Sequence, residues 1–200
     1  MIRLSTAIVA AVVIAGCGTS APRRTGFLGD YTKLTEASAT SFRYVAPAET
    51  SKRYTRFIVD PVKTYDHAEG GREVELGALA EYFRAKLVEA LTPEYPVVSE
   101  AGPGVGRVRV AITDVKAPTW YLNLYPASKL TGAGLGEAGM ELEVVDSVTG
   151  EQVAALVEMQ SGSRLELDTF SKNDDAKDAI DDWCARFRAK LDEIHGVRAK

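Results

Sequence analysis

The chain has 200 residues, with 24 Lys and Arg against 28 Asp and Glu, and its formal net charge is −4. Hydrophobic residues make up 46% of it, which is enough to build the core of one domain. An acidic balance without a basic stripe argues against nucleic acid or anionic lipid headgroups as the main partner.

An unbroken run of nine apolar residues, 7–15, follows Arg3 at the N-terminus. It is long enough for the hydrophobic region of a secretory signal but far short of the roughly 20 residues that span a bilayer. The sequence IAGC at 14–17 then resembles the bacterial lipobox. We expect residues 1–16 to be a lipoprotein signal peptide and Cys17 to be the lipidated N-terminus. An ordinary cleaved signal followed by a chance cysteine is the alternative.

Lipidation would attach a diacylglycerol to the Cys17 thiol and an acyl chain such as palmitate to its amine, which exceeds the two signals that lasting membrane attachment needs. In bacterial lipoproteins generally, Asp after the lipidated Cys favours the inner membrane, and here Gly18 follows. We therefore expect an outer-membrane anchor with the domain in the periplasm. Loss of residues 1–16 removes one basic residue and no acid, so the mature chain carries a charge of −5.

The rest of the chain shows no second domain boundary. Residues 17–26 are expected to be the lipidated Cys and a short tether, because the stretch is small, polar and contains proline. Residues 27–196 should form a single α+β domain and 197–200 a tail. Cys184 lies on the apolar face of a predicted helix, so we expect a buried, unreactive thiol.

The first regular elements follow an irregular segment over 27–47. RFIVDPV at 56–62 predicts a short buried strand that Pro61 ends. Residues 76–93 place apolar side chains at helical spacing, with Pro93 preventing continuation, and predict an amphipathic helix.

Strand periodicity dominates the middle of the chain. Residues 107–115 alternate between apolar and polar, and residues 139–160 do so twice around the turn DSVTGE. This pattern predicts an antiparallel meander with one wet face. The apolar positions expected on the other face are Val108, Val110, Ile112, Met140, Leu142, Val144, Val153, Ala155, Val157 and Met159.

On the wet face, Arg107 and Arg109 are expected opposite Glu141 and Glu143 if the two strands are neighbours. A solvated charged face without coupling is an equal alternative.

A second amphipathic helix is predicted over 174–196. Acidic residues lie at its start, Lys190 and His195 lie near its end, and Gly196 is the stop, which is the charge order that the helix dipole favours. Taken together, the elements predict the α+β class: a two-layer sandwich of about five mainly antiparallel strands with two amphipathic helices on one face, in the order β-α-β-β-β-α.

The search for catalytic or metal chemistry gives only weak signals. GLGEAG at 134–139 has dinucleotide-binding spacing, but a strand follows where the phosphate needs a helix N-terminus. His67 lies near Asp66 and Glu69 without the spacing of a known metal site, so we expect a solvated loop. No nucleophile elbow, zincin helix or phosphate loop is present. We expect no enzyme, no metal and no cofactor besides the lipid on Cys17.

An aromatic segment over 117–130 is the main candidate contact surface. Trp120, Tyr121 and Tyr125 stand in a predicted loop, where residues are usually polar, and such aromatics are enriched at interfaces. The alternative is that the segment caps the core, as an extra strand for example. The residues Phe27, Leu28 and Tyr31 form a second expected contact patch near the membrane.

Five features resemble a bacterial lipoprotein family known only as domain-of-unknown-function family 3313. They are the lipobox, GFLGDY at 26–31, RYTRFIVDPV at 53–62, GPGVGRVRVAITDV at 102–115 and VVDSVTGE at 144–151. The resemblance implies an envelope lipoprotein and supplies no catalytic residues. Where members often have an aliphatic residue, this chain has Gly106, which is expected to loosen the entry to the strand.

These observations lead to three functional hypotheses. The first is a non-enzymatic docking or accessory component of an envelope assembly or transport system, with a protein partner and no nucleic acid. The second is a module that binds a lipid or another apolar ligand, which requires a cavity. The third is a hydrolase that uses carboxylates such as Asp60 or Asp114.

Overall fold

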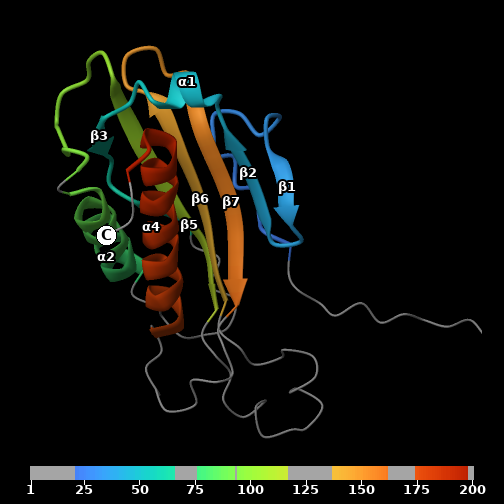
Figure 1. The fold of residues 1–200 in the computed structure, drawn as a ribbon. Helices are drawn as coiled ribbons and strands as arrows, with labels where there is room; N and C mark the ends of the chain where they lie inside the picture. Colours follow the sequence, from blue (N-terminus) through green and yellow to red (C-terminus); the bar gives the residue numbers. More distant parts are fainter. Residues whose placement is uncertain (1–20, 66–75, 93, 117–136, 162–173, 198–200) are drawn as a thin grey trace, which may run out of the picture.

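The computed structural model describes residues 21–65, 76–92, 94–116, 137–161 and 174–197. Two long helices lie on one face of a mixed sheet and give two layers (Figure 1). None of the helices described is long and apolar enough to cross a membrane.

Within the described residues, the sheet has seven strands in the order β1-β2-β7-β6-β5-β3, with β4 also paired to β5. The strands are β1 (Thr35–Ser38), β2 (Ser41–Val45), β3 (Arg56–Val59), β4 (Lys63–Thr64), β5 (Val105–Lys116), β6 (Glu137–Asp146) and β7 (Gln152–Ser161). The helices are α1 (Ala48–Ser51), α2 (Leu76–Leu91) and α4 (Asp174–His195). The predicted α+β class is confirmed. The sheet is mixed because β3 and β4 run parallel to β5, while every other pair is antiparallel.

Both predicted helices are confirmed, and α4 ends where the sequence predicts. Gly196 adopts a left-handed φ of 70°. The amide of Val197 then donates to the carbonyl of Asp192 at 2.9 Å, which satisfies an end carbonyl in the way of a Schellman motif. The turn DSVTGE is confirmed too, because Asp146 Oδ1 accepts the amides of Val148 and Thr149 at 2.8 Å.

The prediction of an irregular segment over 27–47 is wrong, because it contains β1 and β2. All of β1 is exposed, and β2 is at most half-buried. An edge hairpin of this kind shows no buried apolar alternation, which is the signal that sequence reading depends on.

The predicted orientation of β7 is wrong beyond Val153, which itself lies in the main core as predicted. A register shift between Val144 and Val145 changes which β7 side chains face the helices. Ala155 and Val157 pack on the opposite face, in a cluster with Phe27. The side chains of Ala154 and Leu156 instead pack against the main core, which lies between the sheet and the helices.

That main core joins α2, α4 and the middle of the sheet. The rings of Phe83 on α2 and Trp183 on α4 stack with centroids 5.9 Å apart. Cys184 beside them is 3% exposed, and burial raises the pKa of its thiol to about 12. The thiol is therefore buried and protonated at neutral pH, as predicted.

Gly106 does not loosen the entry to β5. A Cβ at this position would lie 2.9 Å from Cε1 of Phe57, whose ring is almost fully buried against the strand. Because Gly106 has no side chain, the Phe57 ring can pack directly against the backbone of β5.

We therefore expect Gly106→Ala to lower the free energy of unfolding by about 1–3 kcal/mol, because the new methyl group overpacks the core. Urea denaturation measures the loss. Gly102→Ala is the matched control, since a Cβ there meets no atom within 4 Å. Equal unfolding midpoints for the two variants would contradict the proposed role of Gly106.

Candidate functional site

A groove lies between α4 and the β2–β7 side of the sheet. Two helices packed about 10 Å apart cover roughly 20 Å, the width of about four strands spaced about 4.8 Å apart. The sheet is wider than that, so β2 and β1 extend past α4 (Figure 1). The uncovered strip of sheet and the side of α4 enclose a volume of about 720 Å³.

The floor and one wall of this groove are apolar. Leu142, Ala154 and Leu156 line the floor, and Phe187, Leu191 and Ile194 on α4 line the wall. Its β2 side is open, where Arg43 is exposed and Val45 is 38% exposed. A volume of this size with mainly apolar walls falls in the range of small-molecule sites.

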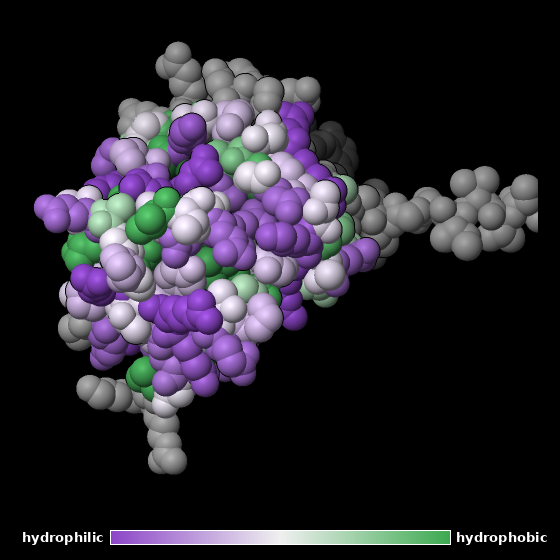
Figure 2. Space-filling view, turned by 90° about the horizontal axis from the view of Figure 1, so that it is seen from above, coloured by the Kyte–Doolittle hydropathy of each residue, from purple (hydrophilic) through white to green (hydrophobic). Residues whose placement is uncertain are grey.

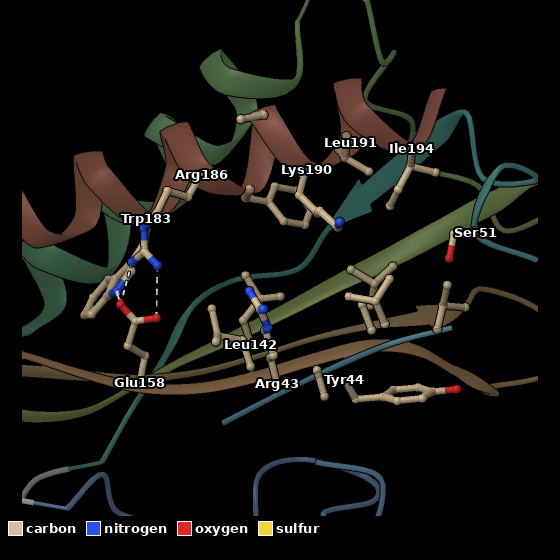
Figure 3. A pocket seen from close by; sticks show the side chains of 18 of the residues that line it. Arg43, Tyr44, Ser51, Leu142, Glu158, Trp183, Arg186, Lys190, Leu191 and Ile194 are labelled. Atoms are coloured by element: carbon tan, nitrogen blue, oxygen red, sulfur yellow. Dashed lines mark hydrogen bonds and ion pairs between the residues drawn. The ribbon is translucent and has the colours of Figure 1, made fainter. Parts of the chain in front are cut away.

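One end of the groove is closed by a charged network around Glu158, which is 5% exposed (Figure 3). Glu158 accepts hydrogen bonds from Trp183 Nε1 at 3.0 Å, Arg186 Nη2 at 2.5 Å and Ser41 Oγ at 3.1 Å. Burial opposes ionisation of Glu158, but hydrogen bonds, led by the one from Arg186, outweigh it and lower its pKa. The network is satisfied and fixes Arg186 across that end.

The rim of the groove is basic. Four basic residues, Lys33, Arg43, Arg186 and Lys190, line it against two acidic ones, Glu158 and Glu193. Both acids already pair with lining cations, since Glu158 binds Arg186 and Glu193 lies 2.8 Å from Lys190 Nζ. A positive groove therefore stands in a chain whose net charge is −4.

Surface hydrophobicity is sparse on the end of the molecule that carries α1. Figure 2 looks onto this end, where the described residues are mostly hydrophilic with small hydrophobic areas between them. The groove, rather than a broad patch on this end, is therefore the candidate site.

The opposite face of the sheet carries a second polar cluster, built on β6. Glu141 and Glu143 alternate with Leu142 and so project from the same face, and both are 0% exposed. The predicted pairing of Arg109 with Glu143 is confirmed, because the two residues lie opposite in register and form an ion pair. Arg107 binds Asp60 at 2.6 Å instead.

The prediction of a wet face is therefore wrong at these glutamates, because the N-terminal strap, residues 25–31, covers them. Glu141 accepts hydrogen bonds from the Thr25 amide at 2.7 Å and from the Tyr31 hydroxyl at 2.7 Å. Glu143 accepts the Gly29 amide at 2.9 Å and Gln152 Nε2 at 3.0 Å. Thr25, which lies within the predicted tether, thus binds the sheet.

The contact patch expected at Phe27, Leu28 and Tyr31 is not an exposed surface in this structure. Phe27 and Leu28 are 6% and 5% exposed and pack against the sheet. Burial, and then the hydrogen bond to Glu141, raise the pKa of Tyr31. These residues hold the strap in place.

The other predicted contact residues, Trp120, Tyr121 and Tyr125, lie outside the described residues, as do Cys17 and His67. Asp60 and Asp114, the acids of the hydrolase hypothesis, lie beside different arginines, Arg107 and Arg23. In the described part of the chain, no group of three or more His, Cys, Asp or Glu could hold a metal ion.

Sequence reasoning missed the groove residues because their signals are ordinary. Arg43 lies in a segment that the sequence predicts to be irregular, and Lys190 near the end of a predicted helix indicates only a helix-end cation. An alternating SFRYV segment bounded by polar residues was the one available sign of β2.

The chain is similar to bacterial lipoproteins and matches one protein family. It is 24% identical over 199 residues to the uncharacterized lipoprotein YdcL of Escherichia coli K12, covering 88% of this chain and 90% of that one. The class is therefore that of bacterial lipoproteins of unknown function. Residues 23–187 match the family described as "Protein of unknown function (DUF3313)", and the chain belongs to this family.

Solved structures give looser likenesses. The PelC dodecamer from Paraburkholderia phytofirmans has a TM-score of 0.44 at 13% identity, over 80% of this chain and 99% of that one. Protein XCC0632 from Xanthomonas campestris has a TM-score of 0.45 at 10% identity, over 69% and 87%. At these TM-scores we draw no conclusion from them.

The hydrogen bonds of the strap lead to a prediction about stability. Tyr31→Phe removes the hydrogen bond to Glu141 and the acceptor for the amides of Gly26 and Leu28, so we expect a loss of about 1–3 kcal/mol of stability. Urea unfolding measures it. Tyr44→Phe is the control, because its ring packs on the same cluster while its hydroxyl has no hydrogen bond to the described residues. A loss in both variants alike would refute the special role of Tyr31.

Proposed function

We propose that this lipoprotein is a membrane-anchored, non-enzymatic binding module that holds an apolar ligand in the groove between α4 and the β2–β7 side of the sheet. The observation that carries the proposal is the groove itself, with about 720 Å³ of space over an apolar floor. The binding-module hypothesis requires a cavity, and the groove supports it.

The walls of the groove suit a ligand better than they suit catalysis. The acidic groups that line it are engaged in ion pairs at its end and rim, as Glu158 is with Arg186 and Glu193 is with Lys190. Binding therefore draws on burial of apolar area, worth about 25 cal/mol per Å² before the costs of association.

Blocking the groove tests this proposal. Ala154→Trp adds an indole to the groove floor at a partly exposed position, and Ala185→Trp adds the same group to the exposed side of α4. Fluorescence titration with phenylnaphthylamine, a neutral apolar dye, should show saturable binding to the full chain carrying Cys17→Ser and to its Ala185→Trp form. We expect at least a tenfold weaker affinity in Ala154→Trp, a loss of about 1.4 kcal/mol. Unchanged binding there, or none in either, overturns the proposal.

We also propose that Cys17 carries the acyl chains and that the anchor lies in the outer membrane, with the domain in the periplasm. The lipobox and Gly18 support this location. Docking on another envelope protein remains a proposal for the same anchored domain. Its expected contacts at Trp120, Tyr121 and Tyr125 lie outside the described residues.

Cys17→Ser should release the protein from the membrane into the soluble periplasm, because no thioether can form. Cell fractionation followed by density-gradient separation of the two membranes measures both attachment and location. Cys184→Ala is the control and should stay in the outer-membrane fraction, since that thiol is buried. Continued membrane association of the Cys17→Ser protein would disprove lipidation at this residue.

A further inference from the structure

We propose, on the basis of the proposed function, that the ligand of the groove is an anionic single-chain amphiphile of the fatty-acid class. Its acid group lies between Arg43 on β2 and Lys190 on α4, and its chain runs along the apolar floor toward α1. The observations that carry this inference are the direction of the two cations, the charge balance of the groove and the polarity of its two ends.

Arg43 and Lys190 point into the groove from opposite sides. Figure 3 shows the Arg43 side chain rising from the sheet and the Lys190 side chain descending from α4 into the space between them. Arg43 on β2 is the register partner of Leu156 on β7, which lines the groove floor. It forms no ion pair with any described residue. A guanidinium with this orientation offers a planar fork of donors to a carboxylate.

Lys190 is available to the same anion. Its ion pair with Glu193 is between side chains that are 47% and 69% exposed, and exposed pairs of this kind contribute little. An incoming acid group therefore displaces or shares this partner at small cost. The groove also has two more basic than acidic lining residues, so its local field favours an anion within an acidic protein.

The two ends of the groove set the direction of the chain. The end at Trp183 is closed by Glu158 and Arg186, whose charges are already satisfied and would be desolvated by a methyl terminus. The other direction is lined by the apolar Leu191, Ile194 and Val144. Ser51 and Tyr54 also line it, and their hydroxyls already donate to the Ala46 carbonyl and to Asp146. The acyl chain is therefore expected to run away from Trp183 and toward α1.

The test compares an acid with its uncharged ester. The full chain carrying Cys17→Ser is titrated with cis-parinaric acid, a fluorescent long-chain fatty acid, and with the methyl ester of the same acid. We expect the acid to bind about tenfold more tightly, as a charge-assisted contact allows. Arg43→Gln and Lys190→Gln should each reduce this preference, and raised salt should reduce it in the unsubstituted groove.

Each substitution has a matched control. Arg56→Gln removes an exposed arginine from β3, at the opposite edge of the sheet from β1. Lys86→Gln removes a lysine of α2 whose ion pair with Glu89 has the same i,i+3 spacing as that of Lys190 with Glu193. Both controls should keep the preference for the acid.

The outcomes separate this inference from the function on which it rests. Equal affinity for acid and ester, with both lost in Ala154→Trp, overturns the anionic headgroup but keeps the groove as an apolar site. No saturable binding of either probe overturns both. A dimer in solution that Ala154→Trp dissociates shows that a second copy fills the groove, and it too overturns the inference.

Discussion

The structure depends on the burial of two glutamates in the middle of its sheet. Glu141 and Glu143 are inaccessible to solvent on the face that the helices leave bare. Buried carboxylates are costly unless hydrogen bonds and charges compensate them, and removing one partner of a buried pair costs about 3–5 kcal/mol. The compensation comes from Arg109, Gln152 and the N-terminal strap, so the two glutamates have all their partners only when the strap is bound.

The position of the N-terminal strap also relates the expected anchor at Cys17 to the groove. The strap binds the face of the sheet opposite α2 and α4, whereas the groove lies between the sheet and α4. Thr25 is only eight positions after Cys17, a reach of at most about 28 Å. An anchor at Cys17 would therefore keep the start of the strap within that distance of the lipidated residue.

The groove arises because the sheet is wider than the pair of helices that covers it. Two helices cannot cover all strands of this sheet, and the added β1–β2 hairpin widens it on the side of β7. The hairpin also brings Arg43 to the rim, opposite Lys190 on α4. The open side of the groove and one of its cations thus come from this hairpin, whereas the segments that resemble the family form the strap, β3, β5 and the β6–β7 turn.

The sequence by itself determined the signal and lipobox pattern, the class of fold and both long helices, because each depends on local periodicity. It offered the pairing of Arg109 with Glu143 only as one of two equal alternatives, and the strand register decided it. Only the tertiary structure decided the rest. The register shift beside Val144 turned β7 over, the strap converted a polar face into a buried one, and the width of the sheet opened the groove. The strap and the width of the sheet depend on contacts between residues more than a hundred positions apart, such as Tyr31 with Glu141, and no local pattern encodes them. The register shift lies within the β6–β7 hairpin, but apolar alternation alone does not show which residue is extra.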